Sequence, residues 1–469
     1  MAHISKFVLL FIVSISLTQF LGCSSVGLSG GGSDFELRKH QEVVLENGMR
    51  ILYVFDNNLP YVSYRMLVGS GSASDPATQA GLASLTSNLL SKGTKDMSAI
   101  DISEAFGQYG SEFGSYVSED YTLLTTSGLS FHGEELFKLF SEVVLKPAFS
   151  KKELNTLKNR RIAQTVKRID SPGSFANLAW QDYLFDQHQY ARPSSGTKKS
   201  LRSIRKKDIT KFYLRNFRPN NTIVSIVGKI EPQLKEKIEK TFSAWKGYPG
   251  KKVQFGDIPK IEGRKIRFVH KPGLVQAQIR LGTKGIRRTN KDYLTLRVAN
   301  VILGGAFSSR LVRRIRRDLG LTYSISSSID ARMDYGPFQV ATFTKSKTVG
   351  KTVEEILTLL EKFHSEGVAK EEVESAKAYI KGIFPRTIET AERLAFNLMI
   401  LRHYGIDDSY LEDFISNINS INVDDVNRVI KSYMNPKDLK ILVYGDKNQS
   451  LKQVKAIGDV ELKNAKDLL

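Results

Sequence analysis

Two stretches of this chain repeat each other: SIRKKDITKFYLRNFRPNNTIVSIVGKI (203–230) and SINVDDVNRVIKSYMNPKDLKILVYGDK (420–447). A shift of 217 residues places Asp425 on Asp208. Each copy has the spacing of an amphipathic helix, then a proline that ends the helix, then a β-branched run that closes on a glycine. Because the repeat is far longer than a solenoid unit, it predicts two similar domains.

The segments around these copies carry alternating strand and helix patterns. In the first half they predict strands at 43–55, 61–72 and 121–130 and helices at 78–91, 98–109 and 134–144. In the second half they predict strands at IRFVHK and AQIRLGTKG and a helix at 294–303. The stretch 246–265 is rich in Gly, Pro and Lys and predicts a linker between the halves. Each half therefore combines a sheet with packed helices, which is the α+β class.

Composition is that of a globular protein, with 469 residues, 41% hydrophobic and 25% charged. Cys23 is the only cysteine, so no intrachain disulfide can form. The net charge of +20 first suggests nucleic-acid binding. No nucleic-acid motif accompanies that charge, so we expect no nucleic-acid partner. Attraction to anionic lipid or to an acidic partner suits the charge better, and a diffusely basic, solvated surface is the alternative.

The N-terminus predicts export. Lys6 precedes the apolar run FVLLFIVSISL (7–17), which is too short to span a bilayer comfortably. The small residue before Cys23 resembles a bacterial lipoprotein cleavage box, so we expect a signal peptide at 1–22 and a flexible tether from a lipidated Cys23 to residue 36 (23–36). This predicts a lipid-anchored protein of the bacterial cell envelope, at the periplasmic face of the outer membrane. An ordinary signal peptide with a chance cysteine is the alternative.

The stretch GLASLTSNLLSKGT (81–94) resembles the zinc-binding helix of the pitrilysin and mitochondrial processing peptidase family, the inverzincins. That family has the pattern G-L-A-H-x-x-E-H-x-x-x-x-G-T. Here Ser84 takes the place of the first histidine, Ser87 of the glutamate and Asn88 of the second histidine. Zinc needs the two imidazoles, and the carboxylate activates the metal-bound water. Hydroxyls and an amide do neither, so we expect no metal in this chain.

Further blocks extend the resemblance over roughly residues 40–450. They are LENGMRILYVFDNNLPYVSYRMLVGSGSASDPATQAGLASL, FGQYGSEFGSYVSEDYTLLTTSGLS, the region from HQYARPSSGTKK to IVSIVGKI, and ILGGAFSSRLVRRIRRDLGLTYSISS. The resemblance implies a clamshell of two homologous domains, 37–245 and 266–465, each a mainly antiparallel sheet packed with helices. It also implies that a peptide is held as an extended strand by addition to a sheet edge.

In active relatives a further glutamate downstream completes the metal site. The matching stretch here, NTLKNRRIAQTVKRIDSP (155–172), contains no glutamate. Near the aligned position lie Gln164, Thr165 and Val166, none of them a usual zinc ligand. The sequence also contains no nucleophile elbow, the G-x-S-x-G motif between a strand and a helix that would indicate nucleophilic catalysis by a serine.

The second-half block keeps an arginine and a tyrosine, Arg316 and Tyr323, in RRDLGLTY. The resemblance implies that such a pair reaches the substrate carbonyl at the scissile bond, where a guanidinium and a phenol stabilise a developing oxyanion. We expect a helix from Leu311 to Asp318 with Gly320 as its stop. The alternative is that Arg316 is surface charge within a basic cluster and that Tyr323 is a core residue.

Three hypotheses follow. The first is the zinc-less subunit of an envelope heterodimeric metalloendopeptidase, which supplies Arg316 and Tyr323 to the active site of a zinc-bearing homologous partner that cleaves unfolded or short peptides. In that case the chain is not active alone and zinc belongs to the partner. The second is a catalytically inactive structural or peptide-binding homologue anchored to the membrane. The third is a lone enzyme that uses unrecognised groups.

Overall fold

The computed structural model describes residues 37–248, 250 and 253–468. The predicted signal peptide, tether and Cys23 lie outside the described residues. All the helices and strands named below belong to one unit, Leu37–Leu469. In the described part of the chain, no helix combines the length and the apolar character needed to cross a membrane.

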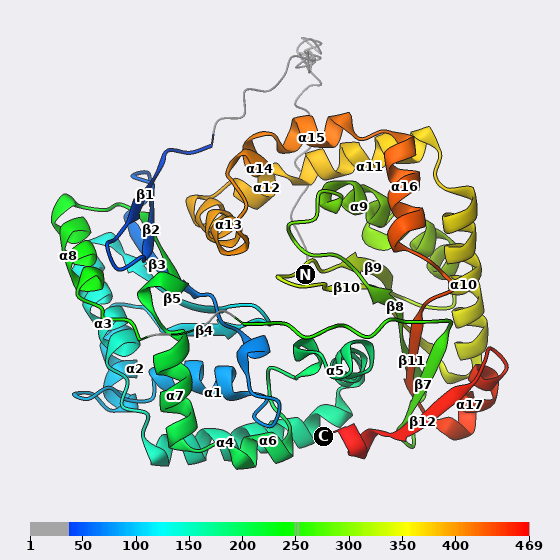
Figure 1. Ribbon diagram of the computed structural model, residues 1–469, viewed down its shortest axis with the longest axis horizontal. Helices are drawn as coiled ribbons and strands as arrows, with labels where there is room; N and C mark the ends of the chain where they lie inside the picture. Colours follow the sequence, from blue (N-terminus) through cyan, green and yellow to red (C-terminus); the bar gives the residue numbers. More distant parts are fainter. Residues whose placement is uncertain (1–36, 249, 251–252, 469) are drawn as a thin grey trace, which may run out of the picture. The chain divides into compact units, whose positions relative to one another are not determined.

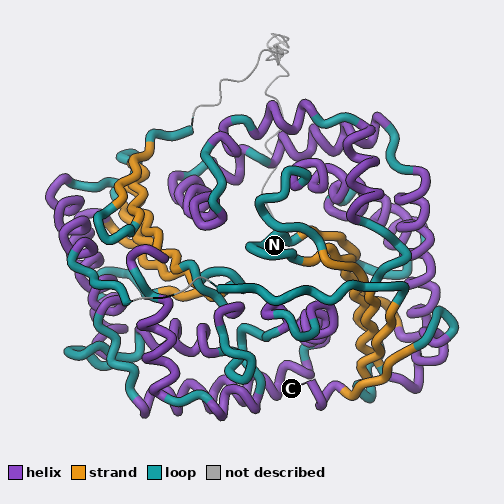
Figure 2. Tube along the Cα trace, in the orientation of Figure 1, coloured by secondary structure: helices purple, strands orange, loops and turns teal. Residues whose placement is uncertain are grey.

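The first sheet has six strands in the order β1-β2-β6-β3-β5-β4. Figure 1 labels five of these strands, and Figure 2 draws this sheet in orange at the left of the view. Its strands are β1 (His40–Val44), β2 (Arg50–Phe55), β3 (Tyr61–Val68), β4 (Gly114–Val117), β5 (Thr122–Leu129) and β6 (Thr222–Gly228). The β2–β6 pair is parallel, with Leu52 opposite Ser225, and all other pairs are antiparallel.

The second sheet has the order β12-β7-β11-β8-β10-β9. Its strands are β7 (Lys265–His270), β8 (Gln276–Lys284), β9 (Ile325–Ile329), β10 (Pro337–Lys345), β11 (Lys440–Gly445) and β12 (Val460–Asn464). The β7–β11 and β12–β7 pairs are parallel and the rest antiparallel. Apart from β1 and β12, the two sheets repeat one order of strands, which confirms the predicted pair of similar, mainly antiparallel α+β domains.

Helices flank both sheets. The first half contains α1 (Leu82–Leu90), α2 (Ala99–Gly107), α3 (Gly133–Leu145), α4 (Lys151–Lys167), α5 (Pro172–Phe185), α6 (Lys198–Ser203), α7 (Lys206–Asn216) and α8 (Pro232–Ser243). The second half contains α9 (Tyr293–Asn300), α10 (Val349–Glu366), α11 (Lys370–Ile383), α12 (Pro385–Ile388), α13 (Ala391–Tyr404), α14 (Ser409–Glu412), α15 (Phe414–Ser420), α16 (Val423–Tyr433) and α17 (Lys447–Lys455). Two π-helical segments, Val301–Gly305 and Val312–Asp318, complete the second half.

The repeat found in the sequence is a structural repeat. Helices α7 and α16 begin and end 217 residues apart. The Asp208 carboxylate accepts a hydrogen bond from the Arg205 N–H at 2.8 Å, and Asp425 accepts one from the Asn422 N–H at 3.2 Å. Each aspartate thereby satisfies a backbone donor that a helix start leaves open.

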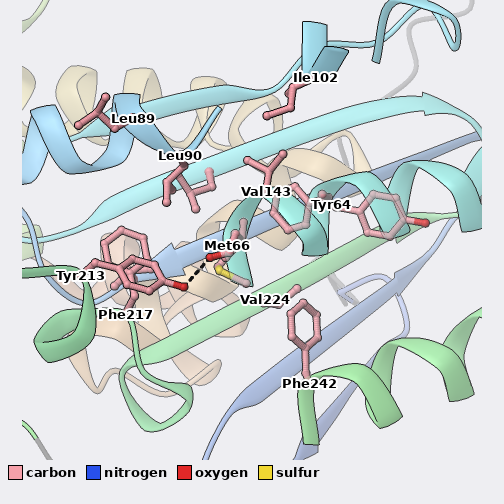
Figure 3. Close-up of a cluster of buried hydrophobic side chains, with 14 of the residues drawn as sticks. Tyr64, Met66, Leu89, Leu90, Ile102, Val143, Tyr213, Phe217, Val224 and Phe242 are labelled. Atoms are coloured by element: carbon pink, nitrogen blue, oxygen red, sulfur yellow. Dashed lines mark hydrogen bonds between the residues drawn. The ribbon is translucent and has the colours of Figure 1, made fainter. Parts of the chain in front are cut away.

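The first core lies between one face of the first sheet and its helices. Figure 3 shows Tyr64 and Met66 of β3 close to Val224 of β6 and Phe242 of α8. Tyr64 and Met66 share a face because side chains alternate along a strand. The amphipathic helices α1, α3, α7 and α8 bury their apolar faces here. Each fully buried large side chain stabilises the fold by about 1.5–3 kcal/mol.

The other face of each sheet is covered by a helix from the other half of the chain. Phe175 and Trp180 of α5 form a buried cluster with Leu442 and Tyr444 of the second sheet. In return, α13 lies against β2 and β6 of the first sheet. Helices α5 and α13 hold corresponding places in the repeat, so the exchange is reciprocal. The limits 37–245 and 266–465 remain predictions, because this packing does not follow the division in the sequence.

Candidate functional site

The helix that corresponds to the family's zinc helix is held by a buried carboxylate at its start. Asp75 accepts hydrogen bonds from the N–H groups of Gly81 and Ala83, both at 2.7 Å. Gly81 has φ +91°, and a Cβ there would meet the Gly196 backbone at 2.8 Å, so only glycine fits. Burial raises the pKa of Asp75 to about 7, against the opposing effect of its N–H donors.

Helix α1 has the predicted apolar face, with Leu82, Leu85 and Leu89 buried. The three degenerate zinc positions lie on the same helix. Ser84 is 8% exposed, and Ser87 is fully buried with no hydrogen-bond partner for its hydroxyl in the described chain. The Asn88 amide donates back to the Ser84 carbonyl at 2.7 Å.

A guanidinium from α4 meets these positions. Arg161 Nη2 donates to Ser84 Oγ at 3.1 Å. Burial lowers the pKa of Arg161, and the nearby Arg168 and Arg160 act in the same direction. A zinc ion placed beside Ser84 would be repelled by this charge.

The downstream positions supply no replacement ligand. Thr165 is buried, and Gln164 and Val166 are exposed on α4. No group of three or more His, Cys, Asp or Glu side chains within the described ranges could hold a metal ion. The residues present therefore do not fit zinc.

The second-half pair lies beside a third aromatic residue. The Arg316 guanidinium carbon is 4.9 Å from the ring centre of Tyr323 and 4.9 Å from that of Phe307. Both rings are 77% exposed. We call these three side chains the Arg316 cluster. Because Tyr323 is exposed, the alternative that it is a core residue is wrong.

The backbone around this cluster is less regular than predicted. The segment Val312–Asp318 is π-helical rather than an α-helix starting at Leu311. Gly320 adopts φ +59° and ends it, as predicted. Tyr323 lies shortly before β9. Single π-helical turns are common at functional sites.

Arg316 differs from three of the four nearby arginines in its partners, and from the fourth, Arg313, in its contact with two aromatic rings. Arg310 pairs with Glu372 at 2.5 Å, Arg314 with Glu355 at 2.9 Å and Arg317 with Asp318 at 3.0 Å. Within the described residues, Arg316 has no ion pair and its side chain makes no hydrogen bond; its contacts are the two rings. Its guanidinium N–H groups are thus unused within this part of the chain.

Sequence reasoning did not single out Arg161 or Phe307. Arg161 lies in the stretch 155–172, where a metal site requires an acidic ligand, so a cation there gives no signal of a site. Phe307 precedes the SSRL of the second-half block, and only the fold brings its ring to Arg316.

The first sheet also offers an edge. Strand β4 is hydrogen-bonded to β5 on one side only, among the strands described. Tyr116 on this strand is exposed. Such an edge has the backbone donors and acceptors that an extended peptide can pair with.

Comparisons with known proteins identify the family. Residues 50–195 match the family model described as Insulinase (Peptidase family M16), and residues 203–380 match the one described as Peptidase M16 inactive domain. A Helicobacter pylori protein named Non-peptidase homolog YmxG is 23% identical, over 94% of this chain and 99% of the relative. A Bacillus subtilis protein named Uncharacterized zinc protease YmxG is 24% identical, over 81% and 92%.

A solved structure gives the same result for the fold. The structure described as peptidase M16 inactive domain from Pseudomonas fluorescens superimposes with a TM-score of 0.81 and 26% identity, covering 87% of this chain and 98% of that one. The chain belongs to peptidase family M16, the insulinase and pitrilysin-like family. Within that family it is an inactive M16-like homologue.

Proposed function

We propose that this chain is the zinc-less subunit of a heterodimeric metalloendopeptidase of the bacterial envelope. In this role Arg316 and Tyr323 complete the active site of a zinc-bearing homologous partner. The observation that carries the proposal is the Arg316 cluster, an arginine between two exposed rings with no acidic partner in the described chain.

The cluster suits oxyanion stabilisation for physical reasons. A guanidinium is permanently charged and presents its N–H donors in one plane. The rings of Phe307 and Tyr323 contact the guanidinium and hold it in place. A carboxylate in their position would neutralise its charge, and the rings do not. Donors fixed before the reaction do not have to reorganise as charge develops on the carbonyl oxygen. The Tyr323 hydroxyl is a further donor at the same place.

The first half supports a division of labour. Ser84, Ser87 and Asn88 supply none of the groups that zinc chemistry needs, and Arg161 adds a positive charge. The chain therefore requires a partner for catalysis, and zinc belongs to that partner. Unfolded or short peptides are the substrate class, held along a strand edge such as β4. Lipidation of Cys23 would keep the complex on the envelope membrane.

The test is turnover by the complex purified from the native host. Arg316→Ala should lower the peptidase rate about 100- to 1,000-fold, the loss expected for one oxyanion donor. Arg313→Ala is the matched control, because Arg313 is exposed in the same segment and makes no ion pair with described residues. Both variants should co-elute with the partner as the unchanged chain does. Full activity of the Arg316→Ala complex would refute the shared site.

A second pair of variants separates the ring of Tyr323 from its hydroxyl. Tyr323→Phe keeps the stacking on Arg316 and removes the donor, so we expect a loss of about tenfold or more in turnover with little change in KM. Tyr323→Leu removes both and should lose more. Equal activity of Tyr323→Phe and the unchanged chain would leave the hydroxyl without a role.

The alternative function is a peptide-binding or structural homologue with no part in catalysis. The free edge of β4 favours it, because strand addition needs no metal. Two results together would establish this alternative. The isolated chain would bind peptides, and no complex that contains the chain would have peptidase activity. Near-stoichiometric zinc and chelator-sensitive activity in the isolated chain would instead establish the lone enzyme.

A further inference from the structure

The positive charge of this protein is concentrated in one part of the chain. Residues 151–218 contain 17 lysines and arginines and five aspartates and glutamates, a net +12 of the chain's +20. This segment runs from the start of α4 to the residues just after α7. The remaining residues are much closer to neutral.

The repeat supplies an internal reference for this charge. The corresponding segment of the second half, 368–435, contains eight lysines and arginines and 11 aspartates and glutamates, a net −3. Its helices α11, α13, α15 and α16 hold the places of α4, α5, α6 and α7. Because one helical frame carries both charge patterns, the fold itself does not require the positive one.

The cations of the first segment are also unneutralised. No lysine or arginine between 151 and 218 lies within 4.0 Å of a carboxylate of the described chain; the nearest paired cations in sequence are Lys146 and Lys229. In the second segment, by contrast, Lys377, Arg393, Arg402 and Arg428 all have acidic partners. A charge that the fold neither needs nor neutralises is available to an external partner.

The helices that carry these cations lie side by side and together form one part of the protein surface. Lys158 of α4 donates to the carbonyls of Arg202 and Ile204 at 3.0 and 2.6 Å, which fixes α4 beside α6 (Figure 1). Lys206 at the start of α7 donates to the Ala148 carbonyl just before α4, at 3.2 Å. The exposed cations of this surface are Lys151, Lys152, Arg160, Lys167, Lys198, Lys199, Arg202, Arg205, Lys206, Lys207, Lys211 and Arg215. We call it the cationic surface.

Two hollows open on the cationic surface. One, of about 650 Å³, is bordered by four cations of α7 around Leu214 and Tyr248. The other, of about 490 Å³, is bordered by Lys198, Lys199 and Arg202. Tyr248 is 57% exposed. An aromatic ring with a polar tip beside lysines suits the interface between lipid headgroups and water.

We propose that the cationic surface binds the anionic phospholipid headgroups of a membrane. The charges extend over α4, α6 and α7, which suits a planar anionic surface better than a single peptide in a groove. Each lysine or arginine near such a surface adds to the attraction. Electrostatic attraction of this kind adds to any other attachment of the chain to the membrane. This inference does not depend on the proposed catalytic role.

The test is sedimentation of the full chain with phospholipid vesicles. Phosphatidylcholine vesicles that contain phosphatidylglycerol are compared with pure phosphatidylcholine, so that any contribution of the N-terminal segment is common to both. The variant is K198Q/K199Q/K207Q/K211Q, four exposed lysines without hydrogen bonds to other described residues. The control removes equal charge elsewhere: K351Q/K362Q/K431Q/K452Q, also exposed.

We expect the unchanged chain and the control to bind the anionic vesicles and to be released by added salt. Each lysine removed from the cationic surface should weaken binding about fivefold, so the quadruple variant should bind about 600-fold more weakly. Equal binding to neutral vesicles, or equal losses in both variants, would overturn the proposal. So would loss of a co-purifying protein from the surface variant with vesicle binding intact, which would assign the surface to a protein partner.

Discussion

Helices α4 to α7 and helices α11 to α16 are two versions of one arrangement. A lysine holds the same place in each. Lys158 donates to two carbonyls, Arg202 and Ile204, and Lys377 donates to those of Asn419 and Ile421, both at 2.9 Å. The two sets of acceptors are 217 residues apart, the same shift that relates α7 to α16.

The two regions differ in their surface charge. The first is strongly basic and its cations have no acidic partner in the described chain, whereas the second is slightly acidic and four of its eight cations are paired. The comparison teaches that a few buried polar contacts and the apolar faces fix this arrangement. The surface charge can then change without changing the fold, and so it carries information about partners.

The largest test of the comparison is the exchange of α5 and α13. Trp180→Ala on α5 should destabilise the protein by about 3–5 kcal/mol and Leu398→Ala on α13 by about 2–5 kcal/mol, because both side chains are buried. Each sheet depends on a helix from the other half, so both variants should shift one common unfolding transition in urea. Ser174→Ala, exposed on α5, is the control. Two separate transitions would show that the halves are independent.

The next test compares the two lysines. Lys377→Met should destabilise by about 2 kcal/mol and Lys158→Met by about 1 kcal/mol, since each leaves two carbonyls without a donor. Lys377 is the more buried and also pairs with Glu374 at 3.0 Å. Burial lowers the pKa of Lys158. Urea unfolding at neutral pH measures both, with Lys152→Met as the exposed control. A negligible effect of either substitution would show that this lysine does not help to hold the arrangement that the two regions share.

The acidic region should also determine part of the response to low pH. The hydrogen bond from Arg310 lowers the pKa of Glu372 in the folded state. The stability from this pair is therefore present above the unfolded pKa of about 4.3 and is lost as pH falls through the lowered folded pKa. Arg310→Met should destabilise by about 1 kcal/mol at pH 7.

The pH dependence of that difference is the measurement. Unfolding of Arg310→Met and of the unchanged chain should converge as pH falls below about 4. Arg317→Met, which removes an exposed pair, is the control. A difference that stays constant down to acid pH would show that Arg310 acts through its packing on Phe363 and its hydrogen bond to the Gly367 carbonyl rather than through Glu372.

The smallest expected effect concerns the helix starts. Asp208→Ala and Asp425→Ala should each destabilise by about 0.5–1 kcal/mol, because each carboxylate satisfies one backbone N–H. Equal effects would confirm that the two helices have equivalent starts, although the net charges of the regions around them have opposite signs. Denaturant midpoints at constant m measure both.

Much of the fold could be predicted from the sequence. The repeat that aligns Asp425 with Asp208 predicted two similar domains. It could be recognised in the sequence because helix-capping residues and strand periodicity are local signals. The leucines of α1 identified its buried face. The loss of the metal site stays a prediction, which rests on the difference in chemistry between the family's ligands and Ser84, Ser87 and Asn88.

The rest depends on contacts between distant parts of the chain. Periodicity predicts that α5 has an apolar face but not that the face lies against the second sheet. Arg161 reaches Ser84 across 77 residues of sequence, and Phe307 meets Arg316 only through two π-helical segments that α-helical spacing does not predict. Such contacts leave no local pattern in a single sequence.

The reciprocal exchange of α5 and α13 has a consequence for any nick in the linker. A protease that cut near Gly256 would produce two fragments, each of which retains the helix that closes the other's sheet. The fragments would remain together as a non-covalent pair until denatured. A gene split at this point would therefore encode two polypeptides, each of which would leave an apolar helix face uncovered until the two meet.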